Sequence, residues 1–198
     1  GVYLRSGIGI MKYVHPDDTN RKEIKPKAEP AIRFAEILLI YAEALNELEE
    51  GANYDVSSWD GSTTYSIKRD IDEMKKGIRP IRRRAGVPDY DLETVYKSQD
   101  EFRKKMKKER QIELMAEGQR YFDLRRWKDA EVEESKKNYG CNFYMSDSKD
   151  QKEQFYTPIE ITDLPTAFSR KLYFWPISHE ELKRNKRLTQ NPGWTYND

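Results

Sequence analysis

Three glutamates spaced four residues apart form the densest group of chemically capable side chains in the sequence. Glu109, Glu113 and Glu117 fall on one face of a predicted helix, where like charges repel unless cations meet them. Carboxylates inside a helical bundle typically bind metal when Glu-x-x-His motifs accompany them. The only histidines, His15 and His179, lie outside the helices concerned. We therefore predict no metal site and no cofactor.

The glutamates can instead form ion pairs with arginines. The arginines occur on the same segment and on two other predicted helices, at Arg110, Arg120, Arg125 and Arg126 and at Arg33, Arg82, Arg83 and Arg84. A guanidinium matches a carboxylate in bidentate geometry. We interpret the glutamates as half of a partly buried Arg/Glu network between packed helices. The sequence also lacks a Gly-x-Ser-x-Gly elbow and a Gly-x-x-x-x-Gly-Lys phosphate loop, so we predict that the protein is not an enzyme.

A second group of side chains has the chemistry of sugar recognition. Sugar rings present flat apolar faces with hydroxyl rims, which Trp and Tyr rings and short polar side chains complement. The segment 51–66, read as a loop between two helices, holds such residues: Asn53, Tyr54, Trp59, Asp60 and Tyr65. The alternative is that Trp59 and Tyr65 pack the loop onto the helices. A similar composition recurs at Tyr139, Asn142, Phe143 and Tyr144.

Helices must position these residues. Apolar residues at spacings of three and four predict a helix over 31–50, with Phe34, Ile37 and Tyr41 on its main stripe. A second helix begins at Ile67, with a kink or break expected from Gly77 and Pro80. A third runs from Ser98 to Lys128, opened by a capping box, and Gly118 is a point where it can bend.

The C-terminal region has fewer regular elements. Ser178 and Glu181 match the capping-box spacing of a short helix that ends near Arg184. Four aromatic residues in this region are expected to belong to the core: Tyr173, Phe174, Trp175 and Trp194.

Composition narrows the class of protein. The chain has 198 residues, enough for one domain, and 36% of them are charged while the net charge is only +1. Aromatics reach 12%, which argues for a folded protein rather than a disordered one. The near-neutral balance gives no reason to expect nucleic acid as a partner. Cys141 is the only cysteine, so no internal disulfide forms.

Five phrases, in order along the chain, resemble the SusD/RagB family. They are IRFAEILLIYAEALNE (32–47), IRRRAGVP (81–88), ERQIELMAEGQRYFDLRRW (109–127), LYFWPISHEEL (172–182) and RLTQNPGW (187–194). Each phrase alone is weakly specific, but their order and spacing together are characteristic. One departure is Ser178, which stands where the family usually has a proline.

The resemblance implies an all-α fold. The expected architecture is an α-α superhelix related to tetratricopeptide repeats, with long irregular loops and at most minor β-hairpins. Residues 1–198 would form a single domain, the C-terminal portion of a longer protein.

The resemblance also implies a function. A lipoprotein on the outer face of the outer membrane of Bacteroidetes would bind glycan nutrients and deliver them to a SusC-type TonB-dependent transporter. Membrane association would come only from a lipid anchor absent from this chain. The alternative is a helical protein-interaction scaffold without a small-molecule ligand.

Overall fold

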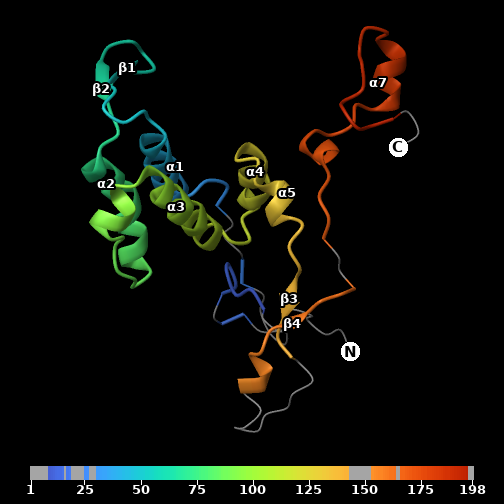
Figure 1. Cartoon of the computed structure of the whole chain (residues 1–198), viewed down its shortest axis with the longest axis horizontal. Helices are drawn as coiled ribbons and strands as arrows, with labels where there is room; N and C mark the ends of the chain where they lie inside the picture. The colour runs from blue at the N-terminus through green and yellow to red at the C-terminus, as the bar shows by residue number, and fades with distance from the viewer. Residues whose placement is uncertain are drawn as a thin grey trace. The chain divides into compact units, whose positions relative to one another are not determined.

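The structure is a computed structural model that describes residues 9–15, 17–18, 25–26, 30–142, 153–163 and 166–195. The chain divides into two compact units, and Figure 1 labels their elements. The helical unit comprises Tyr13–Arg120, and the C-terminal unit comprises Gly1–Lys12 with Tyr121–Asp198. The expected helical class with small antiparallel sheets is confirmed. The expectation of a single domain is not tested by this division and stays a prediction.

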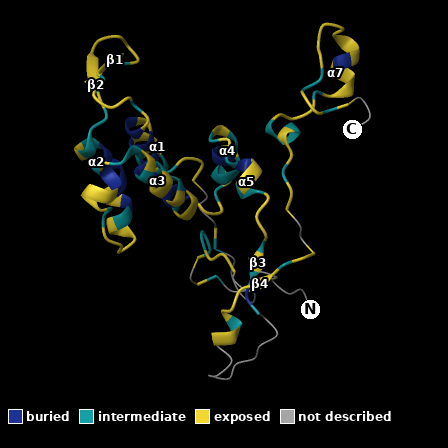
Figure 2. Ribbon diagram, viewed as in Figure 1, coloured by how far each residue is buried: buried dark blue, intermediate teal, exposed yellow. Residues whose placement is uncertain are grey.

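Helix α1 (Phe34–Asn46) is the centre of the helical unit and packs against α2 and α3. Its buried side is formed by Ala35, Leu39, Ala42, Glu43, Leu45 and Asn46. Phe34, Ile37 and Tyr41, which the sequence places on the main apolar stripe, are exposed. Figure 2 colours α1 and its neighbours by burial. The helix is apolar on two sides, and periodicity cannot tell which side its neighbours cover.

Helix α2 (Ile71–Arg84) begins later than predicted because Asp70 caps it. The Asp70 side chain accepts hydrogen bonds from the backbone amides of Asp72 and Glu73, at 2.9 and 3.1 Å. The break expected near Pro80 does not occur, since the helix continues to Arg84 with Ile78 and Ile81 buried on either side of the proline.

Gly77 lets α1 and α2 approach closely. A Cβ atom at this position would lie 2.6 Å from the Leu38 carbonyl oxygen and 2.8 Å from the Ala42 Cβ. Both distances are shorter than van der Waals contact, so the packing of the two helices depends on the absence of a side chain at residue 77.

The third predicted helix is in fact two. Ser98 caps α3 (Gln99–Glu113) as expected, its hydroxyl accepting from the Glu101 amide at 3.3 Å. The helix then ends, and α4 (Gln119–Arg126) begins after five intervening residues, of which Ala116 and Gly118 adopt φ angles of 66° and 78°. Left-handed residues cannot continue a right-handed helix, so a continuous helix to Lys128 was wrong.

Aromatic and sulfur-containing side chains fill the core between α2, α3 and η1 (Leu92–Tyr96), a short π-helix. Tyr96 and Phe102 are fully buried, with ring centroids 5.4 Å apart. Met74 and Met106 are fully buried as well. Tyr90 meets Phe102 edge to face at 6.2 Å, an arrangement that aromatic pairs favour.

The C-terminal unit contains short elements: α5 (Ala130–Glu133), β3 (Tyr139–Gly140), β4 (Ile159–Glu160), η2 (Arg170–Tyr173) and α7 (His179–Arg184). Strands β3 and β4 pair antiparallel, and Ser178 caps α7 as predicted. Phe174 and Trp175 are 59% and 75% exposed, so their assignment to the core was wrong. Among the described residues, no helix has the length and apolar character needed to cross a bilayer.

Candidate functional site

Each of the three glutamates on and just after α3 is paired with an arginine from another part of the helical unit. Arg82 Nη1 lies 2.6 Å from Glu109 Oε2, which also accepts a hydrogen bond from the Tyr90 hydroxyl at 2.7 Å. Hydrogen bonding to Glu109 and, above all, burial raise the pKa of Tyr90 well above its usual range. The pairing confirms the predicted Arg/Glu network.

Arg33 binds the other two glutamates. Its Nε and Nη2 donate to the two carboxylate oxygens of Glu117 at 2.9 and 2.7 Å, and Nη2 lies 2.8 Å from Glu113 Oε1. Glu113 also pairs with Arg84. Hydrogen bonding to Glu117 raises the pKa of Arg33 further above its already high value. Among the described residues, there is no group of three or more His, Cys, Asp or Glu side chains that could hold a metal ion.

The predicted loop at 51–66 is a β-hairpin. Strands β1 (Tyr54–Ser57) and β2 (Thr64–Ile67) pair antiparallel, with Tyr54 opposite Ile67 and Val56 opposite Tyr65. Side chains alternate between the faces of a strand, so these four residues share one face. Asp60-Gly61, flanked by alternating apolar residues, is the sequence signal that reveals such a hairpin.

Asp60 organises the tip of the hairpin, residues 58–63. Its Oδ1 accepts from the hydroxyls of Ser58 and Ser62 at 2.6 and 2.8 Å and from the Ser62 amide at 3.1 Å. The Ser58 hydroxyl in turn accepts from the Thr63 amide at 3.0 Å. Hydrogen bonds, first from the Ser58 hydroxyl, lower the pKa of Asp60 to about 2. This carboxylate therefore holds the tip in shape.

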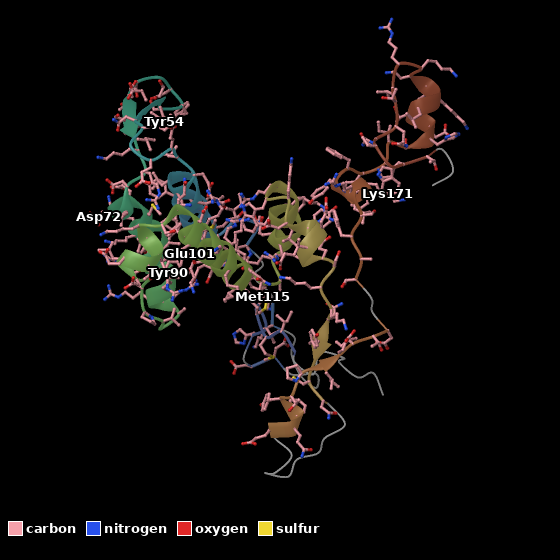
Figure 3. All side chains as sticks on the ribbon, viewed as in Figure 1. Tyr54, Asp72, Tyr90, Glu101, Met115 and Lys171 are labelled. Atoms are coloured by element: carbon pink, nitrogen blue, oxygen red, sulfur yellow. The ribbon has the colours of Figure 1, made fainter. Side chains whose placement is uncertain are left out.

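The aromatic residues of the hairpin point into solvent. Trp59, at the tip, is 98% exposed, so its packing against the helices, the alternative considered from the sequence, does not occur. Tyr54 and Tyr65 are partly exposed on the shared face (Figure 3 labels Tyr54), and Asn53 is exposed just before β1. The structure thus places all five predicted residues on one hairpin, two of them at its tip.

A hollow of about 480 Å³ lies where the base of the hairpin meets α1 and α2. Tyr65 lines it together with residues that sequence reasoning missed: Tyr41, Lys68, Asp70 and Glu73. The Tyr41 hydroxyl donates to Glu73 Oε2 at 2.8 Å, and burial, with a further contribution from Glu73, raises the Tyr41 pKa. A tyrosine within an aliphatic stripe was the signal, because its hydroxyl requires a partner.

The second candidate segment is only partly described. Tyr139 is exposed on β3, opposite Glu160. The Asn142 amide donates to the Phe155 carbonyl at 3.0 Å, while Phe143 and Tyr144 lie outside the described residues.

Comparison with known proteins gives a consistent picture. The SusD family profile matches residues 2–194. The SusD-like protein P2 of Formosa agariphila is 27% identical over 168 residues, which cover 82% of this chain and 25% of that protein. A crystal structure of a SusD-like protein from Bacteroides fragilis is similar with a TM-score of 0.56 and 26% identity, covering 83% of this chain and 25% of the other. The chain thus spans about a quarter of the length of these relatives, and it belongs to the SusD family.

Proposed function

We propose that the chain is part of a non-catalytic surface protein that binds glycan nutrients and delivers them to a SusC-type TonB-dependent transporter. Membership of the SusD family supports the proposal, since the family resemblance implies carbohydrate binding and nutrient uptake. In this proposal the full-length protein is lipid-anchored on the outer face of the outer membrane.

The exposed aromatic face of the β1–β2 hairpin is the observation that carries the proposal. Trp59 leaves almost its whole indole in water, and Tyr54 and Tyr65 add further aromatic surface on one face. Exposed apolar surface rimmed by polar groups is typical of binding sites. Here Asn53 and the side chains of the tip supply the polar rim. The polar and aromatic hollow beneath Tyr65 extends this surface toward α1 and α2.

Calorimetric titration of the full-length protein with a panel of polysaccharides tests the proposal. Trp59→Ala and Tyr65→Ala should each weaken binding by about 1 kcal/mol, the scale of one stacked ring, or roughly fivefold in Kd. Trp175→Ala is the matched control, because Trp175 is also mostly exposed but lies outside the hairpin. Unchanged affinity in both hairpin variants would exclude the hairpin as the site, and failure of every glycan to bind would exclude glycan capture.

A second assay addresses catalysis. Purified protein incubated with a glycan that it binds should release no shorter products, because Glu109 and Glu113 of α3 are each paired with arginine. Chromatographic detection of products that grow with time would overturn the non-catalytic assignment.

The alternative function is a protein-interaction scaffold, and one observation favours it. Ile32, Phe34 and Ile37 form an exposed apolar surface around the start of α1, of the kind that binds proteins. Intact full-length protein that binds no glycan, yet binds the transporter through this surface, would favour the scaffold.

A further inference from the structure

A second hollow, of about 870 Å³, lies within the C-terminal unit. Its walls come from the end of α4, from α5, from η2 and from the turn at Pro192–Gly193. Figure 3 labels Lys171, which lines this hollow from η2. The hollow contains none of the residues assigned to the hairpin, so it requires its own explanation.

Positive charge dominates the lining of this hollow. Arg125, Lys128, Arg170 and Lys171 line it, together with one carboxylate, Glu131, and Glu134, outside the lining, pairs with Arg125. Arg170 Nε lies 3.0 Å from Glu131 Oε1, which neutralises that one acid. Within the described part of the chain, no carboxylate pairs with the ammonium of Lys128. An excess of cations around a concave surface attracts anionic ligands.

Arg125 is held in a fixed position beside the hollow. Its guanidinium lies 3.4 Å from the centre of the Tyr121 ring and 5.5 Å from that of Phe168. Nη1 donates to the Tyr121 carbonyl and to Glu134 Oε1, each at 3.0 Å. Nη2 also lies 3.4 Å from Glu134 Oε2, so Arg125 and Glu134 form an ion pair, and Nε has no acceptor among the described residues.

Two donors next to the hollow lack acceptors. Among the described residues, neither Arg125 Nε nor the Tyr173 hydroxyl has a hydrogen-bond partner, although both atoms are buried. Buried donors are normally satisfied, so each such exception requires an explanation. Arg125 and Tyr173 both line the hollow. Two donors and several cations together favour a ligand rich in negatively charged acceptors.

Lys128 occupies a backbone position that normally favours glycine. Its φ is +58°, and the Lys128 amide donates to the Arg125 carbonyl at 3.1 Å just after α4 ends. Helices commonly end in this left-handed conformation with glycine, since other residues are strained there. A lysine at this strained position is consistent with a role for its side chain.

Apolar side chains complete the lining. Phe174, more than half exposed, and Val132 and Pro192 border the cations. A flat ring that carries an acid group combines the two features that such a lining recognises.

From these observations we propose that the hollow binds an acidic saccharide, in which a carboxylate or sulfate ester meets Lys128 and Arg125 and the ring packs on Phe174. The saccharide character of the ligand rests on the proposed function, whereas the requirement for an anion rests on the hollow itself. This site would add a preference for charged glycans to the aromatic surface of the hairpin.

The test is calorimetric titration of the full-length protein with matched pairs of ligands. In the first pair, oligogalacturonate is compared with its methyl ester, which tests recognition of a carboxylate. In the second pair, a sulfated galacto-oligosaccharide is compared with the unsulfated galacto-oligosaccharide, which tests recognition of a sulfate ester. We expect at least one acid ligand to bind fivefold or more tightly than its neutral partner. The preference should shrink when NaCl rises from about 50 to 300 mM, because salt screens exposed charges.

Lys128→Gly is the decisive variant. It removes the cation and relieves the strained backbone, so Tm should stay the same or rise while the preference for the acid ligand disappears. Lys136→Ala is the control, since Lys136 is an exposed lysine outside the hollow that pairs with Glu133. Phe174→Ala should weaken the binding of the acid ligand and of its neutral partner by the same factor.

Two results would overturn the inference: equal affinity for acid and neutral ligands, or a preference that survives in Lys128→Gly. Either result leaves the proposed function intact if Trp59→Ala still weakens binding. Conversely, a Lys128-dependent preference with no effect of the hairpin variants would refute the hairpin site and support this one.

Discussion

Two Arg–Glu pairs in the helical unit have nearly the same geometry but differ in burial. Arg33 donates to both oxygens of Glu117 at 2.9 and 2.7 Å, and Arg103 donates to both oxygens of Glu47 at 2.8 and 2.7 Å. The first pair has side chains 17% and 10% exposed, and the second 31% and 42%. Arg33 also contacts Glu113, and Arg103 also pairs with Asp100, so each arginine has one further acidic partner. Replacing each arginine with alanine therefore compares a buried and a more exposed pair in the free energy of unfolding.

The expected costs differ severalfold. Removing one partner of a buried pair costs about 3–5 kcal/mol, because the other charge stays buried without compensation. An exposed pair contributes about 0–1 kcal/mol. Glu113 keeps its bond to Arg84, so we expect Arg33→Ala to cost about 3 kcal/mol, at the lower end of the range. Arg103→Ala should cost about 0.5 kcal/mol, since both side chains of its pair with Glu47 are partly solvated.

Urea denaturation of the full-length protein measures both costs. A third variant combines Arg33→Ala with Glu117→Gln, which removes the unpaired charge and should recover part of the lost stability. The reasoning would be refuted if Arg33→Ala cost no more than Arg103→Ala. It would also fail if the double variant were less stable than Arg33→Ala alone, since the uncompensated charge would then not be the cause.

Three further predictions concern the same unit. Gly77→Ala should lower Tm. Overpacking against an α1 backbone oxygen costs about 1–3 kcal/mol, which outweighs the helix-propensity gain of about 1 kcal/mol. An unchanged or raised Tm would contradict the close approach of α1 and α2. Gly118→Ala should cost about 1 kcal/mol in urea unfolding, because φ is +78° although space is open; a neutral result would show that this backbone can relax. Burial raises the pKa of Asp89, but hydrogen bonds from Arg79 and Tyr96 outweigh it and lower the pKa overall. The ionised Asp89 side chain therefore stabilises the fold above its unfolded pKa of about 3.9, and this stabilisation is lost as pH falls through the folded value. In acid unfolding, Asp89→Asn should reduce the pH dependence below about pH 4, and an identical pH profile would contradict this.

Local signals predicted the starts of two helices correctly. Ser98 and Ser178 cap α3 and α7 as their spacing to glutamate indicated. The capping role of Asp70 went unrecognised, and so did the Asp60-Gly61 signal of the hairpin, although both are legible in the sequence.

Other features depend on contacts that sequence periodicity does not contain. The end of α3 depends on Ala116, a good helix former that adopts a left-handed conformation here. The buried side of α1 depends on where α2 and α3 pack, which left Phe34 exposed. The hollow lined by Tyr65 and Glu73 lies between the hairpin and α2. The composition of the loop alone therefore revealed only part of the lining of the hollow.

The hairpin tip is stabilised by its own groups. Ser58, Asp60 and Ser62 bond to one another, and the Ser58 amide donates to the Thr63 carbonyl at 2.8 Å. Substitutions at Trp59 therefore leave these bonds in place and disturb no buried contact of the helices. Point mutations at this tip can therefore change its surface without loss of stability, and the tip offers a position where an engineered loop can be grafted.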